Sequence, residues 1–181
     1  MYGEIAPLGH VLRSFYPEIW TRFHSLPESK RYPESPAEVK EVVRRATKVA
    51  RVLFEDGEAI NIYKSRFHFE DDISPFTQEI AGSFTGIESV LFRANPGVVA
   101  SEDDDIFRTW ALESSWQPAF FEELIRQVAD EREMHVCLVS PKTGNMFCPY
   151  DGGIDIFTPS KQVVDLLQPF SSWRSKRSDG L

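Results

Sequence analysis

Residues 36–54 form an amphipathic pattern that needs a second layer of structure to cover it. Ser35 can cap a helix, Pro36 suits the first helical position, and Glu38 stands where a capping box requires an acid. The apolar face would carry Val39, Val42, Val43, Ala46, Val49, Ala50 and Leu53. The opposite side would carry mostly Lys40, Arg44, Arg45, Lys48 and Arg51, with Glu41 spaced to pair with two of the arginines. Such a helix buries its stripe against a sheet or other helices.

Strand-like patterns elsewhere in the sequence predict a sheet that can cover the apolar face of this helix. Alternating or β-rich runs predict strands at residues 18–23, 59–64, 89–93, 107–113 and 153–157. The best hairpin signal joins residues 134–139 with 145–148 through a four-residue connection. If Ser140 pairs with Asn145, Cys137 lies opposite Cys148. Because neighbouring strands here are often joined by short turns, we expect them to pair antiparallel.

Three further helices are predicted around this sheet. Residues 5–15 have helical spacing, Pro118 opens a second helix, and Pro159 starts a third behind a Thr158 cap. The second should bury Phe120, Phe121, Leu124, Ile125, Val128 and Ala129. The third should bury Val163, Val164, Leu167, Phe170 and Trp173. Residues 66–86 lose any period and read as irregular, and the polar tail 174–181 is expected to fray.

The expected fold is therefore α+β, a mostly antiparallel sheet covered by helices in a single domain spanning residues 1–181. That length suits one core, and 41% hydrophobic residues suffice to form it. No apolar run approaches the roughly 20 residues of a membrane span, and no secretion signal precedes the first helix. Two cysteines agree with a reducing compartment. We expect a cytoplasmic protein with no membrane contact.

Charge narrows the class of partner. The chain has 28 acidic and 20 basic residues, a formal net charge of -8, which repels nucleic acid phosphates. A basic protein is the better electrostatic match, although the same charge also serves solubility. The run Glu102, Asp103, Asp104 and Asp105 is the predicted contact for such a partner.

Motifs for catalysis and for metal binding are weak. The chain has no phosphate-binding Gly-rich loop with Lys, no GxGxxG, GxSxG or HExxH, and no paired CxxC, so no catalytic residue or cofactor is predicted. His68, Glu70, Asp71 and Asp72 could start a metal site, but a solvated acidic loop is favoured. His24 and His135 are interpreted as structural. Cys137 and Cys148 are interpreted as reduced, buried core residues rather than a redox switch.

The segment Pro149-Tyr150-Asp151-Gly152-Gly153-Ile154-Asp155 is the most distinctive local feature. It joins two strands through two glycines, which predicts backbone angles that other residues resist. A tight turn with Asp151 bonded to nearby amides explains it without any function, and a binding or catalytic role is the alternative.

Several short stretches resemble a bacterial family of domains of unknown function. Its members carry Arg-Phe-x-Leu-Gly early and Tyr-Asp-Asp-Arg-Gly-x-Asp late. Here residues 20–23, Trp-Thr-Arg-Phe, resemble the early motif, and Tyr150, Asp151 and Asp155 resemble the late one, which is one residue shorter and lacks the internal Asp-Arg pair. Arg45-Ala46 with Leu53-Phe54 resembles the family's first long helix, and Phe170 to Trp173 its aromatic-x-x-Trp ending. The resemblance implies that Arg22 lies near Asp151 or Asp155, which makes Arg22, Tyr150, Asp151 and Asp155 a candidate functional cluster.

Three hypotheses for function follow. The first is a non-catalytic protein-binding module, of the kind that neutralises a cognate, basic toxin in bacterial competition as immunity proteins do. The second is a small hydrolase or ligand-binding enzyme that uses Arg22, Asp151 and Asp155. The third is a regulatory domain.

Overall fold

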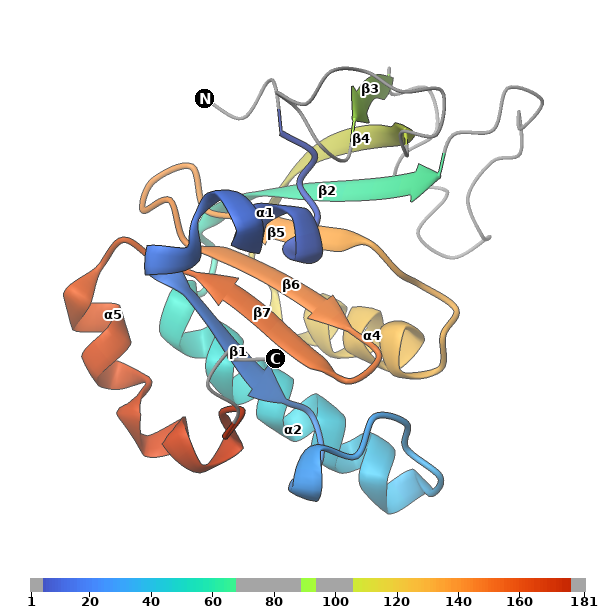
Figure 1. Cartoon of the computed structure of the whole chain (residues 1–181), viewed down its shortest axis with the longest axis vertical. Helices are drawn as coiled ribbons and strands as arrows, with labels where there is room; N and C mark the ends of the chain where they lie inside the picture. The colour runs from blue at the N-terminus through green and yellow to red at the C-terminus, as the bar shows by residue number, and fades with distance from the viewer. Residues whose placement is uncertain (1–4, 68–88, 94–105, 177–181) are drawn as a thin grey trace.

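The computed structural model describes residues 5–67, 89–93 and 106–176, and these residues build one seven-stranded sheet (Figure 1). Its strands lie in the order β1-β7-β6-β5-β2-β4-β3, and every neighbouring pair is antiparallel. The strands are β1 (Trp20–His24), β2 (Ala59–Phe67), β3 (Ser89–Arg93), β4 (Ile106–Ser115), β5 (Val136–Val139), β6 (Met146–Tyr150) and β7 (Gly153–Phe157). The predicted α+β class and antiparallel sheet are confirmed.

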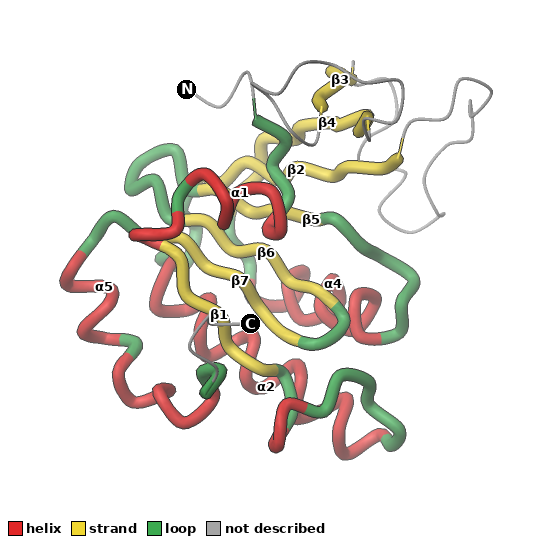
Figure 2. The backbone as a smooth tube through the Cα atoms, viewed as in Figure 1, coloured by secondary structure: helices red, strands yellow, loops and turns green. Residues whose placement is uncertain are grey.

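Helices cover both faces of this sheet. Helices α2 (Pro36–Leu53) and α4 (Pro118–Ala129) lie together on one face, and the short α1 (Gly9–Phe15) crosses the other, as the tube in Figure 2 shows. Helix α5 (Lys161–Leu166) and the 3-10 helix Gln168–Trp173 run beside α2. Shorter 3-10 turns, Pro17–Ile19 and Pro27–Ser29, flank β1. In the described part of the chain, no helix combines the length and apolarity that crossing a bilayer requires.

The main core lies between the sheet and the α2/α4 pair. Its largest side chains are fully buried aromatics, Phe23, Trp116, Phe121 and Phe147. The α1 face has a smaller apolar cluster, which consists of Leu12, Cys137, Val139, Met146, Cys148 and Phe157. Burial of each large side chain contributes about 1.5–3 kcal/mol to the fold. The α1 face therefore has less apolar packing and leaves room for polar groups.

The long helix begins as its sequence predicts, with one exception on its charged side. Ser35 accepts a hydrogen bond from the Glu38 amide at 3.3 Å, and Glu41 holds both Arg44 and Arg45 at 2.6 and 2.7 Å. Arg45, however, is only 7% exposed and donates to the carbonyl of His24 at 3.1 Å. Arg45, which was predicted on the side opposite the apolar stripe, is therefore buried, because the β1 end and the C-terminal segment cover that side of the helix.

Element ends and a few outward residues differ from the predictions. Helix α1 begins only at Gly9, since the preceding Leu8 has an extended backbone, and Phe120 at the start of α4 is exposed. The last helix is capped by Ser160, whose hydroxyl accepts from the Val163 amide, while Thr158 instead donates to Asn145 at 2.7 Å. The predicted fraying does not hold for Arg174, which forms a β-bridge with Phe23. The expectation of irregular structure from residue 66 is wrong for Arg66 and Phe67, which pair with β4 at the end of β2, and residues 68–86 lie outside the described residues.

Candidate functional site

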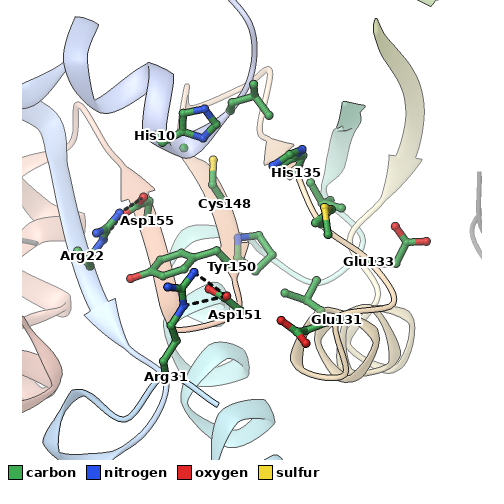
Figure 3. Close-up of a pocket in the computed structure, with 16 residues that line it drawn as sticks. His10, Arg22, Arg31, Glu131, Glu133, His135, Cys148, Tyr150, Asp151 and Asp155 are labelled. Atoms are coloured by element: carbon green, nitrogen blue, oxygen red, sulfur yellow. Dashed lines mark hydrogen bonds and ion pairs between the residues drawn. The ribbon is translucent and has the colours of Figure 1, made fainter. Parts of the chain in front are cut away.

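A cavity of about 280 Å³ opens on the α1 face of the sheet, beside the β6–β7 turn (Figure 3). Five of its lining residues form what we call the inner wall: Arg22, His135, Cys148, Tyr150 and Asp155. Four more form the rim: Arg31, Glu131, Met134 and Asp151. The remaining lining residues include His10 on α1 and Glu133 before β5. The cavity thus gathers side chains from both ends of the chain.

Strand register explains why the inner wall comes together. Arg22 on β1 is the direct partner of Asp155 on β7, and Asp155 is in turn the partner of Cys148 on β6. Cross-strand partners point to the same face of a sheet, so these side chains stand side by side under α1. The row is a consequence of the antiparallel pairing of three strands.

Asp155 is the most tightly held group of the inner wall. Its carboxylate accepts two hydrogen bonds from the Arg22 guanidinium, both at 2.7 Å, and a third from the Trp20 indole at 2.9 Å. The side chains of Asp155 and Arg22 are only 3% and 12% exposed. Burial alone would lower the pKa of Arg22, but the hydrogen bonds and charge of Asp155 raise it above its ordinary value. The pair is therefore locked as a bidentate ion pair.

Tyr150 closes the inner wall over this ion pair. The Arg22 guanidinium lies 4.7 Å from the centre of the Tyr150 ring, a cation-π contact. Burial raises the pKa of Tyr150 to about 12, which keeps the phenol neutral at physiological pH.

His135 is held neutral on the opposite side of the inner wall. Burial, with nearby His10 and Lys64, lowers the pKa of His135 to about 4. Its backbone takes a left-handed φ of 55°, and its Nδ1 is buried without a hydrogen-bond partner among the described residues. Below it, Lys64 and Glu133 form a buried ion pair. Burial also lowers the pKa of Lys64, to about 8.

The two cysteines lie opposite one another, as the hairpin predicts. The Ser140 amide donates to the Asn145 carbonyl at 2.9 Å, and this register places Cys137 beside Cys148. Both thiols are free and buried. Burial, together with neighbouring Cys137, raises the pKa of Cys148 well above its ordinary value, which disfavours the reactive thiolate.

The rim differs from the inner wall in exposure. Arg31, with a side chain 63% exposed, contacts the Asp151 carboxylate through Nε at 2.9 Å and through its terminal nitrogen at 2.8 Å. Glu131 is exposed, carries a left-handed φ of 56°, and has no cationic partner among the residues the structure describes. Met134 is 53% exposed. The rim therefore presents one paired and one unpaired carboxylate beside an apolar side chain.

The glycines of the late motif serve packing, and the expectation of unusual backbone angles is wrong. Left-handed glycines in the described chain are Gly57 and Gly144, not Gly152 or Gly153. A Cβ on Gly153 would lie 2.4 Å from the Phe23 carbonyl oxygen, so only glycine lets β1 and β7 approach there. At Gly152 the nearest atoms belong to side chains at 3.2 Å.

The predicted cluster of Arg22, Tyr150, Asp151 and Asp155 does come together in the cavity. The predicted contact of Arg22 is confirmed for Asp155, whereas Asp151 pairs with Arg31. Sequence reasoning missed Arg31, Glu131 and His10 as lining residues, because no motif marks them. The acidic run at 102–105 and the candidate metal ligands at 68–72 lie outside the described residues. Within the described ranges, no group of three or more metal-binding side chains converges.

Together these features define an α+β domain whose family-like motifs meet around an ion-paired cavity. The chain belongs to the family described as domain of unknown function (DUF3885), which matches residues 8–178. The predicted membership of a family of unknown function is thereby confirmed. No curated protein and no solved structure matches the chain.

Proposed function

We propose that this chain is a non-catalytic binding module for a basic partner protein, acting in the cytoplasm as an immunity protein acts on its toxin. The cavity rim is the docking surface in this proposal. The predicted acidic run at 102–105, which lies outside the described residues, adds attraction for a basic partner in this proposal.

One observation carries the proposal: the inner wall holds its ionisable groups in inert states. Asp155 is held by three hydrogen bonds from Arg22 and Trp20, while Tyr150 and Cys148 have pKa values raised by burial. A catalytic acid, base or nucleophile needs a pKa near the working pH or an activating neighbour. Asp155, Tyr150 and Cys148 have neither such a pKa nor such a neighbour, which favours a binding role over a catalytic one.

The charges of the cavity favour a cationic contact. Arg22 pairs with Asp155, Arg31 with Asp151 and Lys64 with Glu133, which leaves the Glu131 carboxylate without a counter-ion in the described chain. Figure 3 shows Glu131 and Asp151 on the same side of the cavity mouth. A lysine or arginine of the partner could place its charge between them and its aliphatic stem against Met134.

The rim also has the composition of an interaction surface. Arginine, tyrosine and methionine are enriched at protein interfaces. Arg31 and Met134 are exposed at the rim, and exposed Tyr32 lies under the Arg31 guanidinium, 5.3 Å from the ring centre. These three side chains would supply the apolar contact area that charge alone does not.

An enzyme that uses Arg22, Asp151 and Asp155 remains the second candidate, since the cavity does bring all three to one place. The enzyme hypothesis requires Asp155 to take part in the reaction rather than only to hold Arg22. A catalytic carboxylate would have to leave Arg22 or act while bound to it.

The test is co-purification of the chain with the product of its neighbouring reading frame, followed by association kinetics at low and high salt. A variant that reverses Glu102, Asp103, Asp104 and Asp105 to lysine should associate more slowly, with less dependence on salt. The matched control reverses four exposed acids elsewhere, Glu18, Asp56, Glu113 and Asp165. Equal slowing in both variants would reduce the effect to net charge. Failure of the native chain to bind its neighbour would overturn the proposal.

A further inference from the structure

A second cleft, of about 540 Å³, lies where β1 ends, between the turn Pro27–Ser29, α2 and the C-terminal 3-10 helix. Its lining is rich in hydrogen-bond donors: His24, Ser29, Arg45, Ser172, Arg174, Ser175 and Lys176. One carboxylate, Glu28, also lines it. The cleft is separate from the cavity described above, with which it shares no lining residue.

The charge of this cleft opposes that of the whole chain. Arg44 and Arg45 share the single carboxylate of Glu41 at 2.6 and 2.7 Å, and both guanidinium groups lie over the Trp173 ring, at 5.3 and 5.0 Å. Arg174 and Lys176 add two cations against Glu28. A positive cleft on a protein with a formal net charge of -8 selects anions locally.

Two polar atoms beside the cleft lack partners. Arg174 Nε and His24 Nε2 are buried and form no hydrogen bond within the described residues. A buried donor left without a partner is unfavourable, so native proteins rarely keep one unless something else satisfies it. The Arg174 side chain therefore has a hydrogen-bonding capacity that the described residues leave unused.

The backbone at the mouth of the cleft is strained. Glu28 and Ser29 both take left-handed φ values, 55° and 58°, which are uncommon for residues other than glycine. Such strain persists where the surrounding structure needs a particular geometry, and ligand sites are frequent examples. Here the strained turn presents Ser29 at the cleft.

We propose that this cleft binds a small phosphate-bearing anion, held by Arg174 and Lys176 with serine hydroxyls around it, while Arg45 adds positive charge from the cleft wall. Guanidinium groups match the oxygens of a phosphate two at a time, and hydroxyls commonly complete such sites. The binding is independent of the partner proposed for the cavity, so either can fail without the other.

The test is titration of the full chain with pyrophosphate and, separately, inorganic phosphate, read by calorimetry and by the thermal unfolding midpoint. Sodium chloride at matched ionic strength is the control for screening, and citrate is the control for carboxylates. Pyrophosphate should bind saturably and raise the midpoint. Arg174→Gln should weaken binding at least about tenfold, because it removes a charge-assisted contact.

Two further variants keep the test decisive. Lys176→Gln changes an exposed residue, is not expected to disturb folding, and should weaken binding by a smaller factor. Arg126→Gln removes another exposed cation, from α4 and outside the cleft, and should leave binding unchanged. Absence of saturable binding above the chloride control would overturn the proposal. The proposal would also be overturned if both cleft variants kept full affinity, or if citrate bound more tightly than pyrophosphate.

Discussion

The inner wall and the rim of the cavity contain the same kinds of residue but hold them differently. Each has an arginine paired with an aspartate of the late motif: Arg22 with Asp155 inside, Arg31 with Asp151 outside. The inner pair is bidentate, nearly excluded from solvent and bonded also to Trp20, whereas Arg31 of the outer pair stands mostly in water. A buried ion pair is costly to break, and an exposed pair contributes little.

This contrast assigns different roles to two neighbouring halves of one motif. Asp155 on β7 binds Arg22 on the edge strand β1, so its role is structural. Asp151 and its neighbours lie on the rim, where we propose that a partner docks. The predictions below test the separation, from the largest expected effect to the smallest.

Asp155→Asn should destabilise the fold by about 3–5 kcal/mol, because it leaves the Arg22 guanidinium buried without a counter-charge. Equilibrium urea unfolding measures the loss. Asp165→Asn, an exposed position on α5, serves as the matched control and should change stability by less than about 0.5 kcal/mol. A cost near that of the control would show that the inner pair is not structural.

His135 gives the inner wall a dependence on pH. Its folded pKa of about 4 lies below its ordinary value of 6.5, so the unfolded chain takes up a proton first as pH falls. Stability should therefore drop between pH 6.5 and about 4, by up to about 3 kcal/mol, and level off below.

The variant His135→Asn tests this origin, because asparagine tolerates the left-handed backbone at that position. Urea unfolding at a series of pH values should show a flatter profile for the variant than for the native chain. If the variant loses as much stability as the native chain when the pH falls, other groups cause the loss.

Gly153→Ala should destabilise the fold by about 1–3 kcal/mol, since its methyl group would collide with the Phe23 carbonyl in the neighbouring strand. Gly152→Ala is the natural control. Its methyl group would meet only side-chain atoms of Arg31 and Tyr150 and a more distant Arg31 Cα, so a smaller cost is expected. Thermal unfolding of the two variants would settle the order, and the reverse order would contradict the packing argument.

Asp151→Asn should cost no more than about 1 kcal/mol, because its partner Arg31 is largely hydrated. Urea unfolding beside Asp155→Asn gives the comparison directly. Similar losses in the two variants would remove the distinction between the halves of the motif.

Sequence patterns predicted the architecture well where local signals were strong. The Ser35 cap and the apolar stripe of α2 predicted that helix to within a residue, and the Pro141 to Gly144 connection fixed the hairpin register. The patterns failed where tertiary contacts determine which residues are buried, as at Arg45, which the C-terminal segment covers. Helix ends at residues 5–8 and 158–160 were wrong by a few residues for the same reason.

The cavity could be predicted only in part. The family resemblance predicted that Arg22 lies near Asp151 or Asp155, and an antiparallel β1–β7 pairing would have identified Asp155 as the partner. Arg31 and Glu131 reach the site from a loop and from the end of α4, and no periodicity marks such positions. Only glycine fits at position 153 because the Phe23 carbonyl lies against it, and Phe23 is 130 residues away in the chain.

The most direct test of the account is the variant Glu131→Lys, measured for both partner binding and stability against the control Glu113→Lys, which reverses an exposed acid on β4 outside the cavity. The proposed role of the rim predicts that Glu131→Lys slows association with the basic partner by about tenfold relative to the control. Its free energy of unfolding should stay within about 0.5 kcal/mol of the native value. Equal association rates for the two variants, or loss of binding only together with loss of stability, would contradict it.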